Sequence, residues 1–155
     1  MTERNTVKAT FTIERTYPAK PARVFKAFSD EASKARWFAG SDDALGKSYQ
    51  LDFQVGGHEV NEGGPPGGPT YTYTAEFRDI VPETRIVATT EMLADDTRIS
   101  VTLLSVEFQP VNDTTRLVVT EQGAYLDGQE SPAQRKEGTR DLLDALAASL
   151  SAGSD

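Results

Sequence analysis

The spacing of apolar residues changes twice within the first forty positions. Residues 10–17 alternate between polar and mostly apolar side chains, which is typical of a strand buried on one face. Two prolines interrupt this alternation, and Val24, Phe25 and Phe28 then recur at helical spacing. Ser29-Asp30 offers a cap for a second short helix that reaches the Trp37-Phe38 pair. The sequence therefore predicts one strand followed by two short helices.

The middle of the chain reads as consecutive strands joined by turns. The predicted strands are residues 49–55, 58–61, 71–77, 85–92, 98–109 and 116–122. Glycine and proline fill residues 63–69, which cannot continue a ladder and predict a loop at the rim of the domain. Within the fifth of these strands the apolar residues change parity, which predicts a β-bulge or a strong bend near Leu103-Leu104. Short turns between neighbouring strands predict an antiparallel meander.

The last segment carries the clearest helical pattern. Ser131-Pro132 forms a cap with proline at the first helical position. An apolar stripe follows, made of Leu142, Leu143, Leu146 and Leu150 with intervening alanines. We expect an α+β helix-grip fold, with a curved antiparallel sheet of about six or seven strands. The two short helices follow its first strand, and the long C-terminal helix covers the concave face. The space between helix and sheet is either a ligand-accessible cavity or an interior filled by side chains.

Composition narrows the class of protein. A chain of 155 residues is expected to form one domain over residues 1–155, with its core at about 9–150. It has no cysteine, which excludes disulfides and thiolate chemistry. The net charge of −8 argues against a nucleic-acid partner. No apolar run approaches the roughly 20 residues of a membrane span, so we expect a cytoplasmic protein without a membrane partner.

Aromatic and aliphatic residues at strand spacing define a candidate cavity wall. Such residues are most often plain core, but in a curved sheet the core and the cavity wall are the same surface. The predicted ligand-binding residues are Trp37, Phe53, Val55, Tyr71, Tyr73, Phe77, Val101, Leu117, Val119, Glu121, Leu142 and Leu146.

Glu121 carries the most distinctive chemistry of this set. It shares parity with Leu117 and Val119, so it is expected to face the cavity. It is then either a polar anchor or general base toward a bound molecule, or a carboxylate that pairs with an arginine such as Arg98, Arg116 or Arg135.

Few other residues of the sequence suggest a catalytic, metal-binding or nucleotide-binding site. His58 is the only histidine, so it cannot form a multi-histidine metal site, and any Ser-His-Asp triad would depend on it entirely. The glycine-rich loop lacks the strand, helix and lysine of a nucleotide-binding loop. We therefore predict no catalytic residue, no metal and no cofactor, and we lean against an enzyme.

Several short phrases resemble one known family. They are IERTY at 13–17, PARVFKAF at 21–28, WF at 37–38, FQVGG at 53–57, YTAEFRDIVP at 73–82, RIV at 85–87, TRL at 115–117, EQGAY at 121–125, Gly138 and LLDAL at 142–146. Together they resemble the START-like (SRPBCC) superfamily. Within it they resemble the family of the activator of heat-shock-protein-90 ATPase, C-terminal-domain type, in its bacterial stand-alone form. The resemblance covers about residues 9–150, and its phrases are structural rather than catalytic.

Three functions remain open on these grounds. The first is a module that binds a small hydrophobic or aromatic molecule between sheet and helix. The second, implied by the resemblance alone, is a stress-related cochaperone-like partner of a chaperone. The third is a cyclase, aromatase or hydrolase that works through polar residues of the cavity. An exposed edge strand leaves both a monomer and a homodimer open.

Overall fold

The computed structural model describes residues 4–39 and 48–152. The first strand, β1 (Thr6–Tyr17), leads into α1 (Pro21–Ser29) and α2 (Glu31–Phe38), in the predicted order. Proline stands at the start of α1, where its missing N–H costs nothing. The side chain of Asp30 caps α2 by accepting a hydrogen bond from the Ser33 backbone N–H at 3.1 Å.

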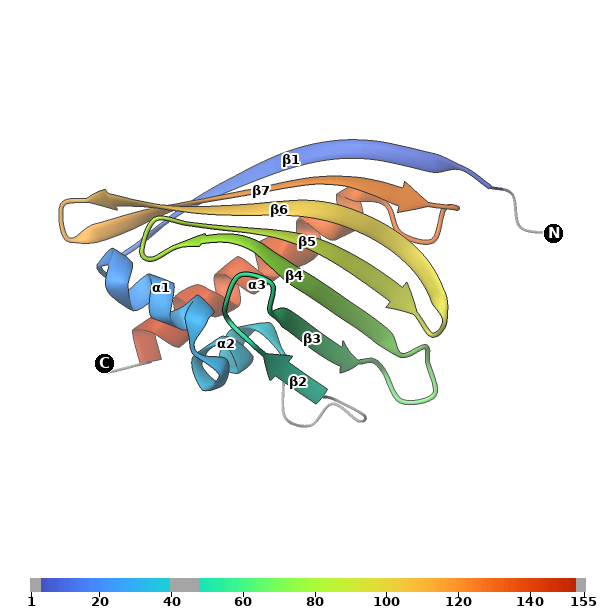
Figure 1. The fold of residues 1–155 in the computed structure, drawn as a ribbon, viewed down its shortest axis with the longest axis horizontal. Coiled ribbons are helices and arrows are strands. Elements are labelled where there is room, and N and C mark those ends of the chain that lie inside the picture. Colours follow the sequence, from blue (N-terminus) through green and yellow to red (C-terminus); the bar gives the residue numbers. More distant parts are fainter. Residues whose placement is uncertain (1–3, 40–47, 153–155) are drawn as a thin grey trace.

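Seven strands of the described residues form one antiparallel sheet (Figure 1). After β1 come β2 (Ser48–Leu51), β3 (His58–Gly63), β4 (Tyr71–Val81), β5 (Arg85–Ala94), β6 (Thr97–Val111) and β7 (Thr114–Leu126). Their order is β1-β7-β6-β5-β4-β3-β2. The strands from β2 to β7 form the predicted antiparallel meander, and β1 pairs with β7 at one edge of the sheet. The predicted strand at 49–55 is shorter than expected, since β2 ends at Leu51. The α+β helix-grip fold is confirmed.

The bulge of β6 lies four residues before the predicted position. Met92 of β5 pairs with Ser100 and Leu93 pairs with Arg98, so Ile99 is the extra residue. From Ser100 onward the register with β7 is unbroken, so a bulge at Leu103-Leu104 was wrong. The parity change arises because Val101 and Leu103 are apolar residues on the convex face, each 39% exposed. Bulges add local twist, so this one helps to curve the sheet.

The C-terminal helix, α3 (Pro132–Ala152), lies across the concave face of the sheet (Figure 1). It begins with a capping box, since Ser131 Oγ accepts from the Gln134 backbone N–H at 3.1 Å and the Gln134 side chain accepts from the Ser131 N–H at 3.0 Å. Its Leu143, Leu146 and Leu150 are buried. Burial of each leucine stabilises the fold by roughly 1.5–3 kcal/mol, which holds the helix against the sheet.

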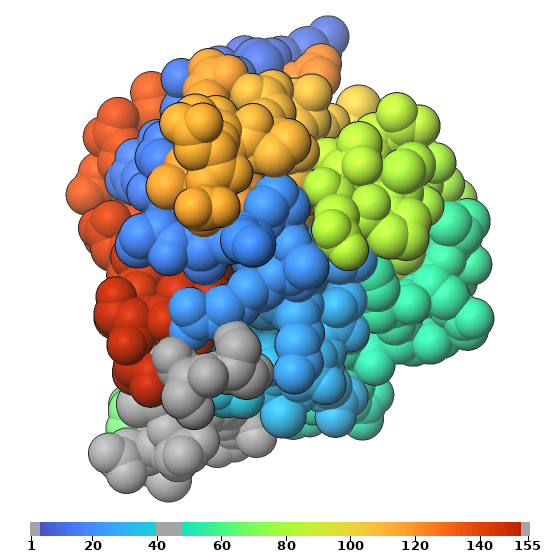
Figure 2. Space-filling view, turned by 90° about the vertical axis from the view of Figure 1, so that its left-hand side faces the viewer, coloured from blue at the N-terminus to red at the C-terminus, as the bar shows by residue number. Residues whose placement is uncertain are grey.

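The two short helices close one end of the space under α3. Figure 2 views this end of the molecule. The blue α1 and α2 lie in the middle, with the red α3 on one side and two green segments, the β2–β3 region and the β4–β5 turn, on the other. Phe28 of α1 lies edge-to-face against Phe108 of β6 and Trp37 of α2, with ring centroids 5.4 and 5.0 Å apart. The Trp37 indole donates to the Ala27 carbonyl at 3.0 Å. No helix within the described residues is long and apolar enough to cross a membrane.

A candidate ligand cavity

A cavity of about 280 Å³ lies between the sheet and α3. Its apolar wall consists of Phe28, Trp37, Phe38, Phe53, Phe77, Ile86, Ala88, Met92, Leu104, Val106, Val119, Leu142 and Leu143. Its polar wall consists of Lys34, Glu59, Asn61, Tyr73, Glu121, Glu130, Gln134, Arg135, Thr139 and the backbone of Gly138. Two of these residues, Gln134 and Gly138, are exposed on α3, and we call them the cavity mouth.

Seven of the twelve predicted residues line this cavity. They are Trp37, Phe53, Tyr73, Phe77, Val119, Glu121 and Leu142. They come from α2, the β2–β3 connection, β4, β7 and α3, so the fold brings together residues that are up to 105 positions apart, from Trp37 to Leu142. Contact of these residues with a ligand remains a prediction.

Two of the other predicted residues are core rather than cavity wall. Leu117 and Leu146 are both completely buried and do not border the cavity. Each lies on the inner face that its parity predicts, but neighbouring side chains cover it fully. Periodicity identifies the inner face, and packing decides which inner residues keep a free surface.

Three predicted residues lie on the surface instead. Val55 is 61% exposed because β2 ends before it and the chain turns there, with Gly56 at a φ of +86°. Tyr71 is 41% exposed because it stands at the first position of β4 beside the 64–70 loop. Val101 is 39% exposed because the bulge at Ile99 leaves it on the convex face. None of the three borders the cavity.

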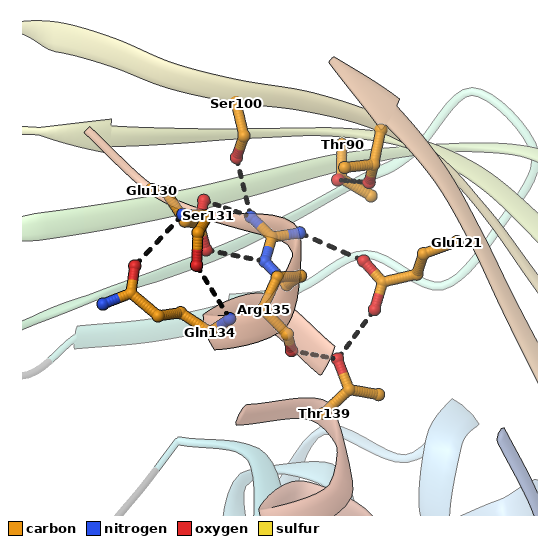
Figure 3. A network of polar contacts seen from close by, with 9 residues as sticks. Thr90, Ser100, Glu121, Glu130, Ser131, Gln134, Arg135 and Thr139 are labelled. Atoms are coloured by element: carbon orange, nitrogen blue, oxygen red, sulfur yellow. Dashed lines mark hydrogen bonds and ion pairs between the residues drawn. The ribbon is translucent and has the colours of Figure 1, made fainter. Parts of the chain in front are cut away.

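Glu121 lies inside, as its parity predicted, and it pairs with Arg135 of α3 (Figure 3). Its Oε1 accepts from Arg135 Nη1 at 3.0 Å, and its Oε2 accepts from the Thr139 hydroxyl at 2.7 Å. Glu121 and Arg135 are 6% and 9% exposed. Of the three arginines considered from the sequence, the structure therefore selects Arg135.

Arg135 is the centre of this polar network. Its Nε donates to Glu130 Oε2 at 2.9 Å, and its Nη2 donates to Glu130 Oε1 at 3.0 Å and to the Ser100 hydroxyl at 2.7 Å. Burial by itself lowers the pKa of the Arg135 guanidinium, but the hydrogen bonds and charges of Glu130 and Glu121 outweigh it and raise that pKa above its usual range. The network joins α3 to β6 and β7.

A second buried ion pair occupies the end of the cavity near α2, and sequence reasoning missed it. Lys34 Nζ donates to Glu59 Oε2 at 2.7 Å, and the two side chains are 8% and 3% exposed. The Tyr49 hydroxyl donates to the same oxygen at 2.5 Å. The Lys34 ammonium also lies 4.3 Å from the centroid of the Phe38 ring, a cation–π distance.

One signal in the sequence could have located half of this pair. Glu59 alternates with His58, so if that histidine is outside, the carboxylate is inside. The structure has this arrangement, with the His58 side chain 63% exposed and 3.5 Å from Glu76, away from the cavity lining. Nothing local to Lys34 distinguishes it from a surface lysine.

The carboxylates also affect the tyrosines around them. Burial first, and then the charge and hydrogen bond of Glu59, raise the pKa of the Tyr49 hydroxyl far above its ordinary value. Burial, followed by the charges of Glu59 and Glu121, raises the pKa of Tyr73 as well. Both phenols stay protonated at neutral pH and can donate hydrogen bonds.

The curved antiparallel sheet and the single long helix that together enclose this cavity define a START-like domain of the helix-grip class. Residues 18–151 match the family described as Activator of Hsp90 ATPase homolog 1-like protein, and the chain belongs to that family. The resemblance found in the sequence is thereby confirmed.

Solved structures of bacterial proteins are similar over nearly the full chain. A protein of Rhizobium loti is 48% identical with a TM-score of 0.87, covering 94% of this chain and 99% of its own. An uncharacterized protein of Rhizobium leguminosarum is 40% identical with a TM-score of 0.92, covering 98% and 100%. A protein of Chromobacterium violaceum shares the fold at 24% identity and a TM-score of 0.73, covering 90% and 94%. A comparison with curated proteins gives no match.

Proposed function

We propose that this protein binds a small, largely apolar molecule in the cavity between the sheet and α3. The observation that carries the proposal is the cavity itself, which has a volume of about 280 Å³ and a wall of aromatic and aliphatic side chains. Ligand sites typically combine such a wall with a few convergent polar groups. Here those groups are the two ion pairs, Lys34 with Glu59 and Arg135 with Glu121.

The position of Gly138 supports access from solvent. It lies in the interior of α3, where glycine costs about 1 kcal/mol relative to alanine. Gly138 both lines the cavity and is exposed to solvent, and a Cβ added there would meet no side chain or other segment within 4 Å. A site that exchanges ligand with solvent needs such an opening.

Gly138 also provides the test. Soaks or native mass spectrometry against small aromatic compounds should detect binding to the wild-type protein and to Gly138→Ala, which adds one methyl group in open space. Gly138→Phe places a ring at the cavity mouth and should abolish binding while the fold, followed by circular dichroism, stays intact. Failure of every compound to bind the wild-type protein, or equal binding to Gly138→Phe, would overturn the proposal.

Family membership supports a second candidate, a cochaperone-like interaction with a chaperone ATPase. The support is associational, because it rests on the family description rather than on a surface of this chain. Adding the protein to a bacterial chaperone of the heat-shock-protein-90 type should then change its rate of ATP hydrolysis. An unchanged rate, together with no co-purification, would remove this candidate.

The geometry favours a structural role for Glu121 over the role of general base. Both of its oxygens are engaged, one by Arg135 and one by Thr139. A base takes up a proton during the reaction, and protonation of Glu121 would weaken its ion pair with the buried Arg135. The enzyme alternative stays a prediction.

A further inference from the structure

The charged groups of the cavity wall are unequal in number. Two cations, Lys34 and Arg135, face three carboxylates, Glu59, Glu121 and Glu130, which leaves the lining with a net charge of −1. Charges inside a protein interact much more strongly than in water, so an enclosed excess of one sign affects what can enter.

Both cations of the lining are already paired with carboxylates of the same wall. Arg135 uses four of its five N–H groups, since Nε and Nη1 donate once each and Nη2 donates twice. Lys34 donates to Glu59, and its ammonium lies 4.3 Å from the Phe38 ring centroid and 5.5 Å from those of Phe28 and Trp37. Neither residue presents the free fork or free ammonium that recognises a carboxylate or phosphate.

The carboxylates, in contrast, keep acceptor capacity. Both hydrogen bonds to Glu59 fall on Oε2, and no described residue donates to its Oε1. Glu121 accepts two hydrogen bonds, although an ionised carboxylate has about four acceptor positions. Both residues border the cavity, so a ligand can complete their hydrogen bonding by donating to them.

The same carboxylates also affect the pKa of Tyr73. After burial, the charges of Glu59 and Glu121 are the main causes that raise the pKa of Tyr73, which also lines the cavity. The interactions that keep this phenol uncharged oppose any other anion at the same place.

From the free acceptors, the net negative lining and the cations that are already paired with carboxylates, we infer that the cavity selects a neutral or cationic hydrogen-bond donor, such as an aromatic alcohol or amine, and excludes carboxylates and phosphates. This inference rests on the proposed function, because it concerns the ligand of the same cavity. The cavity would then distinguish between apolar molecules of equal size by the charge of their polar group.

The experiment compares three probes with one aromatic body: naphthylmethanol, naphthylmethylamine and naphthoate. Isothermal titration at neutral pH should give dissociation constants for the alcohol and the amine at least about tenfold below that for naphthoate, since like charges in an enclosed site repel strongly. Gly138→Phe should remove binding of all three.

Two matched variants test the origin of the preference. Glu59→Gln removes one cavity carboxylate and should bring the naphthoate affinity to within about threefold of the amine affinity, since the lining becomes neutral. Glu62→Gln makes the same change three positions further along β3, outside the cavity lining, and should leave the ratio unchanged. The double variant Lys34→Met/Glu59→Gln restores the net charge of −1 and should restore the exclusion of naphthoate.

The outcomes separate the two proposals. If no naphthyl probe binds, or if Gly138→Phe binds them equally well, the proposed function fails and this inference fails with it. If naphthoate binds the wild-type protein as tightly as the amine and Gly138→Phe abolishes that binding, the proposed function holds and this inference is overturned. The wild-type comparison alone decides, so a poorly folded Glu59→Gln does not weaken the test.

Discussion

Replacement of Lys34 by methionine is the sharpest test of how this cavity is built. The substitution keeps an unbranched side chain of similar length but removes the ammonium 2.7 Å from Glu59 Oε2. The Glu59 side chain is 3% exposed, so its charge would remain in a nearly dry site. The Tyr49 hydroxyl would be its one remaining hydrogen-bond donor among the described residues.

The expected cost is large, because the variant leaves a buried charge without its counter-charge. Breaking a buried ion pair from one side costs about 3–5 kcal/mol of stability. For a domain of this size each kcal/mol corresponds to about 2–4 °C in melting temperature, so a fall of roughly 6–20 °C is expected.

Urea denaturation followed by circular dichroism measures the change in the free energy of unfolding. The double variant Lys34→Met/Glu59→Gln should recover at least about 2 kcal/mol relative to Lys34→Met, because the new amide side chain is neutral and still accepts from Tyr49. Lys8→Met, on the exposed part of β1, is the control and should stay within about 0.5 kcal/mol of the wild type.

Two results would refute the reasoning. One is a loss below about 1 kcal/mol in Lys34→Met, which would place the ammonium in solvent rather than in a buried pair. The other is a double variant no more stable than the single one, since that would leave no coupling between the two residues.

Three further predictions concern the helix cap, the core and the tyrosines. Ser131→Ala should lower the free energy of unfolding by about 1 kcal/mol in urea titrations, whereas Ser151→Ala in the last, exposed turn of α3 should leave it within about 0.5 kcal/mol. Leu146→Ala should cost about 2–5 kcal/mol in the same assay, while Leu103→Ala on the convex face should cost under about 1 kcal/mol; equal losses would contradict the assigned faces. Burial is the first cause that raises the pKa of Tyr17, Tyr49, Tyr73 and Tyr125 in the folded protein. Their contribution to stability is therefore complete below about pH 10, where free tyrosine ionises, and is lost as the pH rises above it. Tyrosinate absorbance and loss of circular dichroism should rise together, and ionisation of these four residues without unfolding would contradict the assignment.

The order and type of the elements could be predicted because each depends on local chemistry. Proline starts α1 and α3, and Asp30 and Ser131 accept the first free N–H groups of their helices. Alternation along β4 and β7 placed Tyr73, Phe77, Val119 and Glu121 on the inner face, and all four line the cavity. A residue's face follows from the period of its own element, which is written in the sequence.

The errors have one physical cause, which is that strand ends and register depend on the neighbouring strands. Val55 follows the expected alternation, but β2 ends at Leu51 and Val55 lies in a turn. The bulge at Ile99 became visible only from the pairing of β6 with β5. An apolar residue on the convex face, such as Val101, is indistinguishable in sequence from one that faces inward.

The sequence by itself determined the helix-grip order of elements, the helix caps, and the inner faces of β4 and β7, because these follow from backbone geometry within a few residues. The tertiary structure decided which charges meet. Lys34 and Glu59 are 25 residues apart, and Glu121 and Arg135 are 14 apart on different elements. Their contacts depend on how far the sheet bends toward the helices, and this curvature arises from pairing across the whole sheet. The charge of the cavity, and with it the proposed choice of ligand, is therefore a property of the assembled fold.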